Sequence, residues 1–144
     1  MSEQANYGTN DSIGVRLINH ADDVVLPVGE HDFSEAINRC LLVDKTMFIA
    51  DMLDCEASVA LCCRPKGFGK SMNLSMLKCY LERPVHRRAD RNIFVGTQIW
   101  EAGGGRYRDE HARYPVISLD LSAVARRGTD AAAAMRGVLE RECA

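Results

Sequence analysis

The spacing of apolar residues changes at Gly69, from a strand-like run to a helix-like repeat. Residues 58–63 (SVALCC) form a compact apolar run of strand length, and Pro65 ends it. Residues 70–83 carry apolar side chains at helical spacing, and this helix is expected to end before Pro84, because the residue preceding a proline avoids helical geometry. The pattern therefore predicts a strand, a loop and a helix in succession. The buried stripe of the helix is expected to comprise Leu74, Met76, Leu77, Tyr80 and Leu81.

Two shorter helices are predicted upstream of this segment. Asp32 can cap the first helix, with Glu35 in the position of its capping-box partner three residues later. Thr46 is expected to cap the second helix, which covers residues 47–53. Both predictions rest on a polar side chain placed directly ahead of an apolar stretch with helical spacing.

Downstream, the pattern predicts a second buried strand over residues 114–122 (YPVISLDLS) and a closing helix over residues 129–144. The glycine-rich segment 102–113 is expected to be a flexible loop. The order strand, helix, strand, helix indicates an α/β fold with a parallel sheet flanked by helices. Residues 1–23 are polar and lack a clear period, so we expect a disordered leader followed by one domain over residues 24–144.

The composition is that of a water-soluble globular protein of cytoplasmic type. Apolar residues make up 47% and charged residues 26% of the 144 positions. No apolar run approaches the roughly 18 residues that a membrane helix needs, and the N-terminus lacks the features of a signal peptide. The six cysteines include no C-x-x-C pair and no Cys/His cluster with zinc spacing, so we expect reduced, mostly buried thiols.

The charges are unevenly distributed along the chain. Residues 1–60 carry a net charge of −8, whereas residues 61–144 carry +6. The basic half begins close to the glycine-containing loop. This distribution fits an anion-binding site, and it fits equally well a basic surface that pairs with the acidic half.

Residues 67–71 (GFGKS) have the composition of a phosphate-binding loop. Gly67 and Gly69 allow the main chain to turn sharply and to approach a ligand closely. The first N–H groups of the following helix have no intrahelical partner, and together with the helix dipole they attract an anion. Lys70 can then contact the β- and γ-phosphates as a point charge, and the Ser71 hydroxyl can ligate Mg²⁺.

The match to the general phosphate-loop motif is incomplete, because Arg64 stands where that motif has a glycine. A G-K-S/T tripeptide arises by chance in about one chain in twenty of this length. An unrelated α/β domain with a chance match therefore remains an alternative. The strand-like run before the loop and the helix after it favour a phosphate loop. Arg64 can contact phosphate or adenine, or it can pair with an acid and fix the loop.

The loop and its flanks resemble the AAA-ATPase-like family of bacterial and archaeal proteins. Its loop typically has the sequence R-P-R/K-x-F-G-K-S/T, which residues 64–71 (RPKGFGKS) match; residues 43–46 (VDKT) match its N-terminal segment. The resemblance covers about residues 26–122. It implies a P-loop NTPase fold that binds ATP with Mg²⁺, with Ser71 as the metal ligand. The cofactor-binding residues that it implies are Arg64, Pro65, Lys66, Gly67, Phe68, Gly69, Lys70 and Ser71.

The resemblance also implies parts that residues 1–144 lack. The family's acidic motif, which positions the attacking water, lies on a later strand, and many members carry a C-terminal nuclease-like domain of the PD-(D/E)XK type. We therefore expect a partial P-loop NTPase fold, truncated before the acidic-motif strand, as in a fragment, a split gene or a decayed copy. ATP binding is predicted, whereas hydrolysis by this chain alone is not, and the catalytic residues are unknown. Asp120 is assigned to the preceding strand, which favours a capping role over a catalytic one.

A second hypothesis for the function is a non-catalytic interaction module. A parallel sheet buries both faces, so a sheet without its central strands leaves apolar surface exposed. That surface would pair with a separately encoded C-terminal half. No membrane contact is expected.

Two further groups of residues have a functional and a structural interpretation. Asp44 and Lys45 can lie near the nucleotide, but a buried ion pair or a helix-start role is favoured. A basic loop has no interleaved aromatic residue, which favours a solvated loop over nucleic-acid binding. Its arginines are Arg83, Arg87, Arg88 and Arg91.

Overall fold

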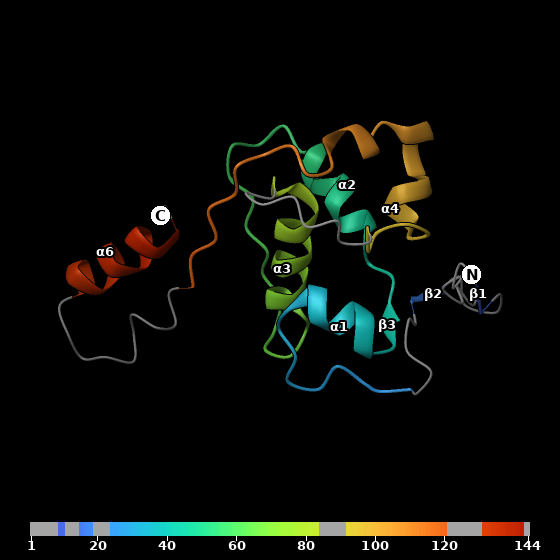
Figure 1. The fold of residues 1–144 in the computed structure, drawn as a ribbon, viewed down its shortest axis with the longest axis horizontal. Helices are drawn as coiled ribbons and strands as arrows, with labels where there is room; N and C mark the ends of the chain where they lie inside the picture. Colours follow the sequence, from blue (N-terminus) through green and yellow to red (C-terminus); the bar gives the residue numbers. More distant parts are fainter. Residues whose placement is uncertain (1–8, 11–14, 19–23, 84–91, 121–130, 143–144) are drawn as a thin grey trace. The chain divides into compact units, whose positions relative to one another are not determined.

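The computed structural model describes residues 9–10, 15–18, 24–83, 92–120 and 131–142. The chain divides into two compact units, residues 1–114 and residues 115–144. The first unit contains all the described strands and most of the helices (Figure 1). The predicted domain over residues 24–144 stays a prediction, and each compact unit is described by itself.

Helices dominate the first unit. They are α1 (Phe33–Arg39), α2 (Met47–Leu53), α3 (Lys70–Leu81), α4 (Gln98–Glu101) and the 3-10 helices η1 (Ala102–Gly105) and η2 (Arg108–Glu110). The helix predicted over residues 47–53 is confirmed, as is the helix that starts beside Gly69 and ends before Pro84. α1 packs against α3, and α2 contacts both α3 and α4 (Figure 1).

The N-terminus of α1 is capped by Asp32, as the sequence predicts. Its Oδ1 accepts hydrogen bonds from the N–H groups of Ser34 at 2.8 Å and Glu35 at 3.2 Å. The reciprocal half of the capping box is absent from the described contacts, because the Asp32 N–H donates to Glu30 Oε1 at 3.2 Å instead. Asp32 thus satisfies two of the amide groups that a helix start leaves without a partner.

The described strands form a small antiparallel sheet in the order β1–β2–β3. These strands are β1 (Thr9–Asn10), β2 (Val15–Ile18) and β3 (Leu42–Val43). β2 pairs with β3 through Leu17 opposite Val43 and Ile18 opposite Leu42. Ile18 is buried in the core.

The core lies where α1, α2, α3 and α4 meet the end of the sheet. Its largest fully buried side chains include Tyr80, Phe94, Ile37 and Ile49. Phe94 stacks on Phe33 and meets Tyr80 edge-to-face, with ring centroids 5.6 Å and 4.9 Å apart respectively. These contacts hold the residues after Asn92 against the first and third helices.

The predicted parallel sheet is not present among the described residues. Residues 58–63 and the described part of residues 114–122, which are expected to be its strands, form no ladder there beyond one isolated bridge at Tyr114. Val59 is 84% exposed and Leu61 is 85% exposed, so the apolar run lies in solvent rather than in a sheet core. The sequence pattern identified apolar segments correctly, but a strand also needs neighbours that accept and donate its main-chain hydrogen bonds. The only parallel contact described is an isolated bridge between Glu82 and Tyr114.

The segment that follows α4 is more ordered than the predicted flexible loop. η1 and η2 occupy most of it, and Tyr107 between them is buried. Gly103 and Gly104 both adopt positive φ angles, of 62° and 61°, which an L-residue rarely adopts. The glycines therefore shape a tight turn here.

The second unit contains α6 (Ala131–Glu142), which agrees with the predicted closing helix. Val138 is buried, whereas Met135 and Leu139 are exposed. No helix in the described ranges is long and apolar enough to cross a membrane.

Candidate functional site

The candidate phosphate loop overlaps the first two residues of a 12-residue helix. α3 begins at Lys70, and the residue before it, Gly69, adopts a left-handed conformation with φ 70° and ψ 23°. Gly67 also has a positive φ, of 87°. A Cβ atom at either glycine would meet no other atom within 4 Å, so these positions require glycine for main-chain conformation rather than for space. The loop therefore leads directly into a helix, but the described residues before it form no strand.

The side chain of Lys70 folds back over the loop. Its Nζ donates hydrogen bonds to the main-chain carbonyl oxygens of Arg64 at 2.7 Å and Pro65 at 2.9 Å. The N–H of Phe68 also donates to the Pro65 carbonyl, at 3.4 Å. The ammonium group thereby links the start of α3 to the beginning of the loop.

The first turn of α3 presents main-chain donors. The first hydrogen bond of the helix runs from the Asn73 N–H to the Gly69 carbonyl at 2.9 Å. The N–H groups of Lys70, Ser71 and Met72 have no hydrogen-bond acceptor among the described residues. Because the helix dipole places partial positive charge at the same end, this turn attracts anions.

The loop is also electropositive. The Arg64 guanidinium donates to the Cys63 carbonyl at 3.2 Å, and within the described ranges no carboxylate forms an ion pair with Arg64, Lys66 or Lys70. The sequence leaves two roles open for Arg64, contact with phosphate or adenine and pairing with an acid. The second is not observed among the described residues. Ser71 is exposed at the start of the helix.

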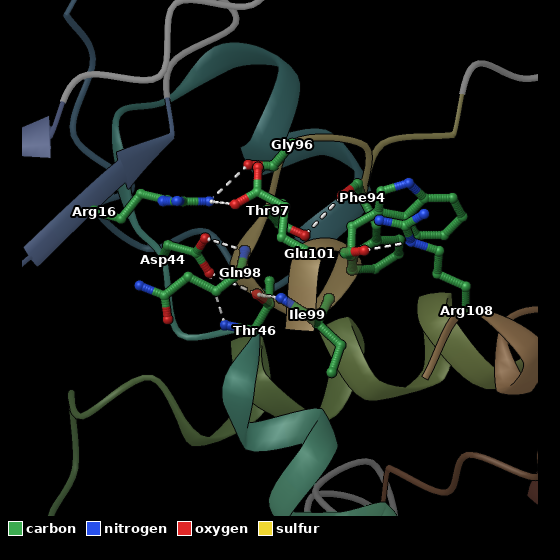
Figure 2. Close-up of polar contacts among 11 residues, drawn as sticks. Arg16, Asp44, Thr46, Phe94, Gly96, Thr97, Gln98, Ile99, Glu101 and Arg108 are labelled. Carbon is green, nitrogen blue, oxygen red and sulfur yellow. Dashed lines mark hydrogen bonds and ion pairs between the residues drawn. The ribbon is translucent and has the colours of Figure 1, made fainter. Parts of the chain in front are cut away.

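Asp44 of the segment VDKT joins two helix starts (Figure 2). Its Oδ1 accepts hydrogen bonds from the N–H and the hydroxyl of Thr46 at 2.9 Å and 2.7 Å, and its Oδ2 accepts one from the N–H of Gln98 at 2.8 Å. Thr46 Oγ1 in turn accepts from the N–H of Ile99 at 3.1 Å. Asp44 is only 7% exposed, whereas Lys45 is exposed. The helix-start role is therefore the one observed, and Thr46 caps α4 rather than its own helix, α2.

Arg16 attaches the sheet to α4 and to the residue before its N-cap. Figure 2 shows its guanidinium reaching the Gly96 carbonyl at 3.1 Å and the Glu101 carboxylate at 2.8 Å. On the far side of α4, Arg108 donates to the Trp100 carbonyl and lies over the Trp100 ring, 5.5 Å from its centroid. None of these contacts could be predicted from the sequence, because each joins residues whose local patterns are unrelated.

A further anchor lies where the chain leaves α2 toward the phosphate loop. The Asp54 carboxylate accepts hydrogen bonds from Arg106 and from the Tyr107 hydroxyl, the latter at 2.7 Å. The Tyr80 hydroxyl donates to the Tyr107 carbonyl at 2.7 Å. The hydrogen bond to Asp54 raises the pKa of Tyr107, and burial raises the pKa of Tyr80 to about 12, so both hydroxyls keep their protons at neutral pH. The exposed segment that contains the loop therefore lies between two anchored residues, Asp54 and Lys70.

The remaining sequence predictions have mixed outcomes. Of the described cysteines Cys40 is buried and Cys79 half-buried, whereas Cys55, Cys62 and Cys63 are exposed, so the prediction of mostly buried thiols is wrong. No group of three or more His, Cys, Asp or Glu residues in the described ranges could hold a metal ion. Residues 84–91 of the basic loop lie outside the described residues. Asp120 lies in the second unit, so its catalytic role stays untested.

Comparison with known proteins identifies a family but no individual relative. A family model described as "Predicted AAA-ATPase" matches residues 27–143, which is most of the chain. Neither a curated protein nor a solved structure matches the chain.

Proposed function

We propose that this chain, which belongs to the AAA-ATPase-like family of predicted AAA-ATPases, binds ATP with Mg²⁺ through residues 64–71. The observation that carries the proposal is the start of α3 at Lys70, directly after two glycines with positive φ. A phosphate loop needs a main-chain turn at this place, so that the first helical N–H groups and the lysine act on one anion.

Each residue of the loop has a distinct role in the proposal. The N–H groups at the start of α3 would hold phosphate oxygens, which would supply the acceptors that these donors lack in the described contacts. Lys70 would exchange the carbonyls of Arg64 and Pro65 for the β- and γ-phosphates. Ser71 would ligate Mg²⁺, which neutralises phosphate charge when it is bound.

A titration with a fluorescent ATP analogue in the presence of Mg²⁺ tests the proposal. We expect saturable binding by the wild type and a loss of about tenfold or more in affinity for Lys70→Ala, since a charge-assisted contact contributes roughly 1.5–3 kcal/mol. Lys45→Ala is the matched control, because Lys45 is exposed and lies outside the loop. Equal affinities of the wild type and Lys70→Ala would refute the proposal.

A second function, that of an interaction module, is favoured by the exposed segment 58–63. Val59 and Leu61 are exposed, and no main-chain N–H of residues 58–63 donates a hydrogen bond among the described contacts. A strand from a separately encoded polypeptide could add to this segment. It would bury the apolar side chains and accept hydrogen bonds from the main-chain N–H groups.

Size-exclusion chromatography with light scattering tests this second function. A Val59→Glu, Leu61→Glu double variant should abolish co-elution with the product of an adjacent reading frame if the segment is the contact. A protein that remains a cooperatively folding monomer and binds no such product would exclude the interaction module while leaving the ATP proposal intact.

A further inference from the structure

Two adjacent cysteines, Cys62 and Cys63, directly precede the candidate phosphate loop and form a cysteine pair. The pair lies in the exposed connection between α2 and α3 (Figure 1). Both residues are free thiols, as is the exposed Cys55 earlier in the same connection. The two other described cysteines are buried or half-buried. Among the described cysteines, only these three are therefore open to a reagent in the solvent.

The charges beside the cysteine pair are positive. Arg64 follows Cys63 directly, and its guanidinium donates a hydrogen bond to the Cys63 carbonyl at 3.2 Å. Lys66 is three residues from Cys63, a span of at most about 11 Å even in an extended chain. This span is close to the Debye screening length of about 10 Å at 0.1 M salt, so both cations act at the pair. No carboxylate forms an ion pair with either cation in the described part of the chain.

Cys55 provides a comparison within the same connection, because the charges next to it are acidic. It lies between Asp54 and Glu56. The Asp54 carboxylate is paired with Arg106, whereas Glu56 forms no ion pair with any described residue. A negative charge therefore stays uncompensated beside Cys55, which is exposed and free like the pair.

We propose that the cysteine pair is a modification site for anionic low-molecular-weight disulfides, of which glutathione disulfide is the probe. In the reaction, the thiolate of one cysteine attacks one sulfur of the reagent, and the S–S bond of the reagent breaks. A new S–S bond joins the protein to one half of the reagent. The other half leaves as a thiolate, which takes up the proton that the cysteine has lost. The cations beside the pair favour this reaction because they attract the negatively charged reagent.

The modification would regulate the proposed ATP site, and this consequence rests on the proposed function. The Lys70 Nζ donates to the carbonyls of Arg64 and Pro65, the two residues that follow the cysteine pair. A glutathionyl group carries two carboxylates and one ammonium group, a net charge of about −1 at neutral pH. The mixed disulfide therefore places negative charge beside the cations that would hold the phosphates, and it weakens ATP binding until it is reduced.

Peptide mass spectrometry of the reduced full chain after brief treatment with glutathione disulfide tests the site. Cys55 and the pair fall in one tryptic peptide, residues 46–66, whose fragments report each thiol. At low salt we expect the pair to react at least about threefold faster per thiol than Cys55, because a local potential of about one kT concentrates an anion by that factor. The preference should fall toward equality in 1 M salt. Cystamine, a doubly cationic disulfide, should instead react faster with Cys55.

Two matched variants test whether charge directs the modification. Lys66→Gln should reduce the preference of glutathione disulfide for the pair, because one of the two nearby cations is lost. Lys45→Gln removes an exposed cation outside the connection and should leave the preference unchanged. A pair that reacts no faster than Cys55 with glutathione disulfide, or a preference that is the same for both disulfides, would overturn the proposal.

Binding of the fluorescent ATP analogue to the modified Cys55→Ser variant tests the consequence. We expect the affinity to fall about tenfold or more and to recover with dithiothreitol. A Cys62→Ser, Cys63→Ser double variant should keep its affinity under the same treatment, and it should fold because both positions are exposed. Unchanged affinity after complete modification would overturn the consequence. Absence of binding by the untreated protein would refute the proposed function and this consequence, but not the modification site, whose rates are measured without nucleotide.

Discussion

The carboxylate of Asp44 accepts a hydrogen bond from the main-chain N–H of Gln98 at 2.8 Å, across 54 positions of sequence. The same carboxylate binds Thr46, and Thr46 binds the next residue of α4. Two short helices of 7 and 4 residues are thereby joined at their N-termini by one buried acid. Helices this short have little stability of their own, so the acid determines their arrangement.

Replacement of Asp44 by alanine should destabilise the protein by about 2–4 kcal/mol, because three donors near the core lose their acceptor. The loss would be measured by urea unfolding followed by circular dichroism. Asp51→Ala, at an exposed position of α2, is the matched control and should change stability by less than about 0.5 kcal/mol. A loss of the same size in both variants would show that Asp44 does not join the helices.

Local features of this fold could be predicted from the sequence, whereas its long-range links could not. The Asp32 cap and the limits of α2 depend on residues within one helical turn, so a pattern of neighbours suffices. The link from Asp44 to Gln98 has no such pattern, because either residue alone is compatible with many partners.

The buried face of α3 shows the same limit. Helical spacing predicts that Leu74 and Tyr80 face the core together, yet Leu74 is 56% exposed and Tyr80 is fully buried. The face that is buried depends on where α1 and the Phe94 segment pack, and spacing within α3 contains no information about them. The start of α3 could be located from sequence because the glycines, lysine and serine that mark it lie within five consecutive residues.

Gly69→Ala should weaken the proposed phosphate loop through main-chain strain. The φ of 70° at Gly69 costs an L-residue about 1–2 kcal/mol, while the space around the new methyl group is empty. We expect a loss of stability of that order and weaker binding of the ATP analogue. Gly69→Asn should lose less, because asparagine adopts this conformation more readily than alanine does. Equal effects of the two substitutions would argue against strain as the cause.

Tyr80→Phe should cost about 1–2 kcal/mol of unfolding free energy, since the buried Tyr107 carbonyl would lose its donor while the ring packing on Phe94 is kept. Tyr114→Phe is the control, because among the described residues the hydroxyl of Tyr114 bonds to the half-buried carboxylate of Glu110 and not to a core carbonyl. Thermal unfolding of both variants measures the difference. If Tyr114→Phe proves as destabilising as Tyr80→Phe, the buried hydrogen bond is not the source of the stability.

The stability of the first unit should decrease as the pH falls below about 6.5, through His111. Burial among Tyr80, Phe94 and Trp100 lowers the pKa of His111 from its usual 6.5, so the folded chain binds a proton less readily than the unfolded chain. The neutral imidazole therefore contributes its full stabilisation at pH values above the pKa of His111 in the unfolded chain. This contribution is lost as the pH falls toward the pKa of His111 in the folded chain.

Urea unfolding at pH 7.5 and pH 5.5 measures this loss. His111→Gln removes the titrating group, so its stability should change less between the two pH values than that of the wild type. His31→Gln, at an exposed position, should retain the wild-type difference. Arg108, Glu110 and Arg113 lie close to His111 in the sequence, so the effect of their charges must be separated from that of burial. A repeat of the measurement in 1 M salt screens these charges, whereas the effect of burial on the pKa of His111 remains. An unchanged pH dependence in His111→Gln would assign the acid sensitivity to the carboxylates instead.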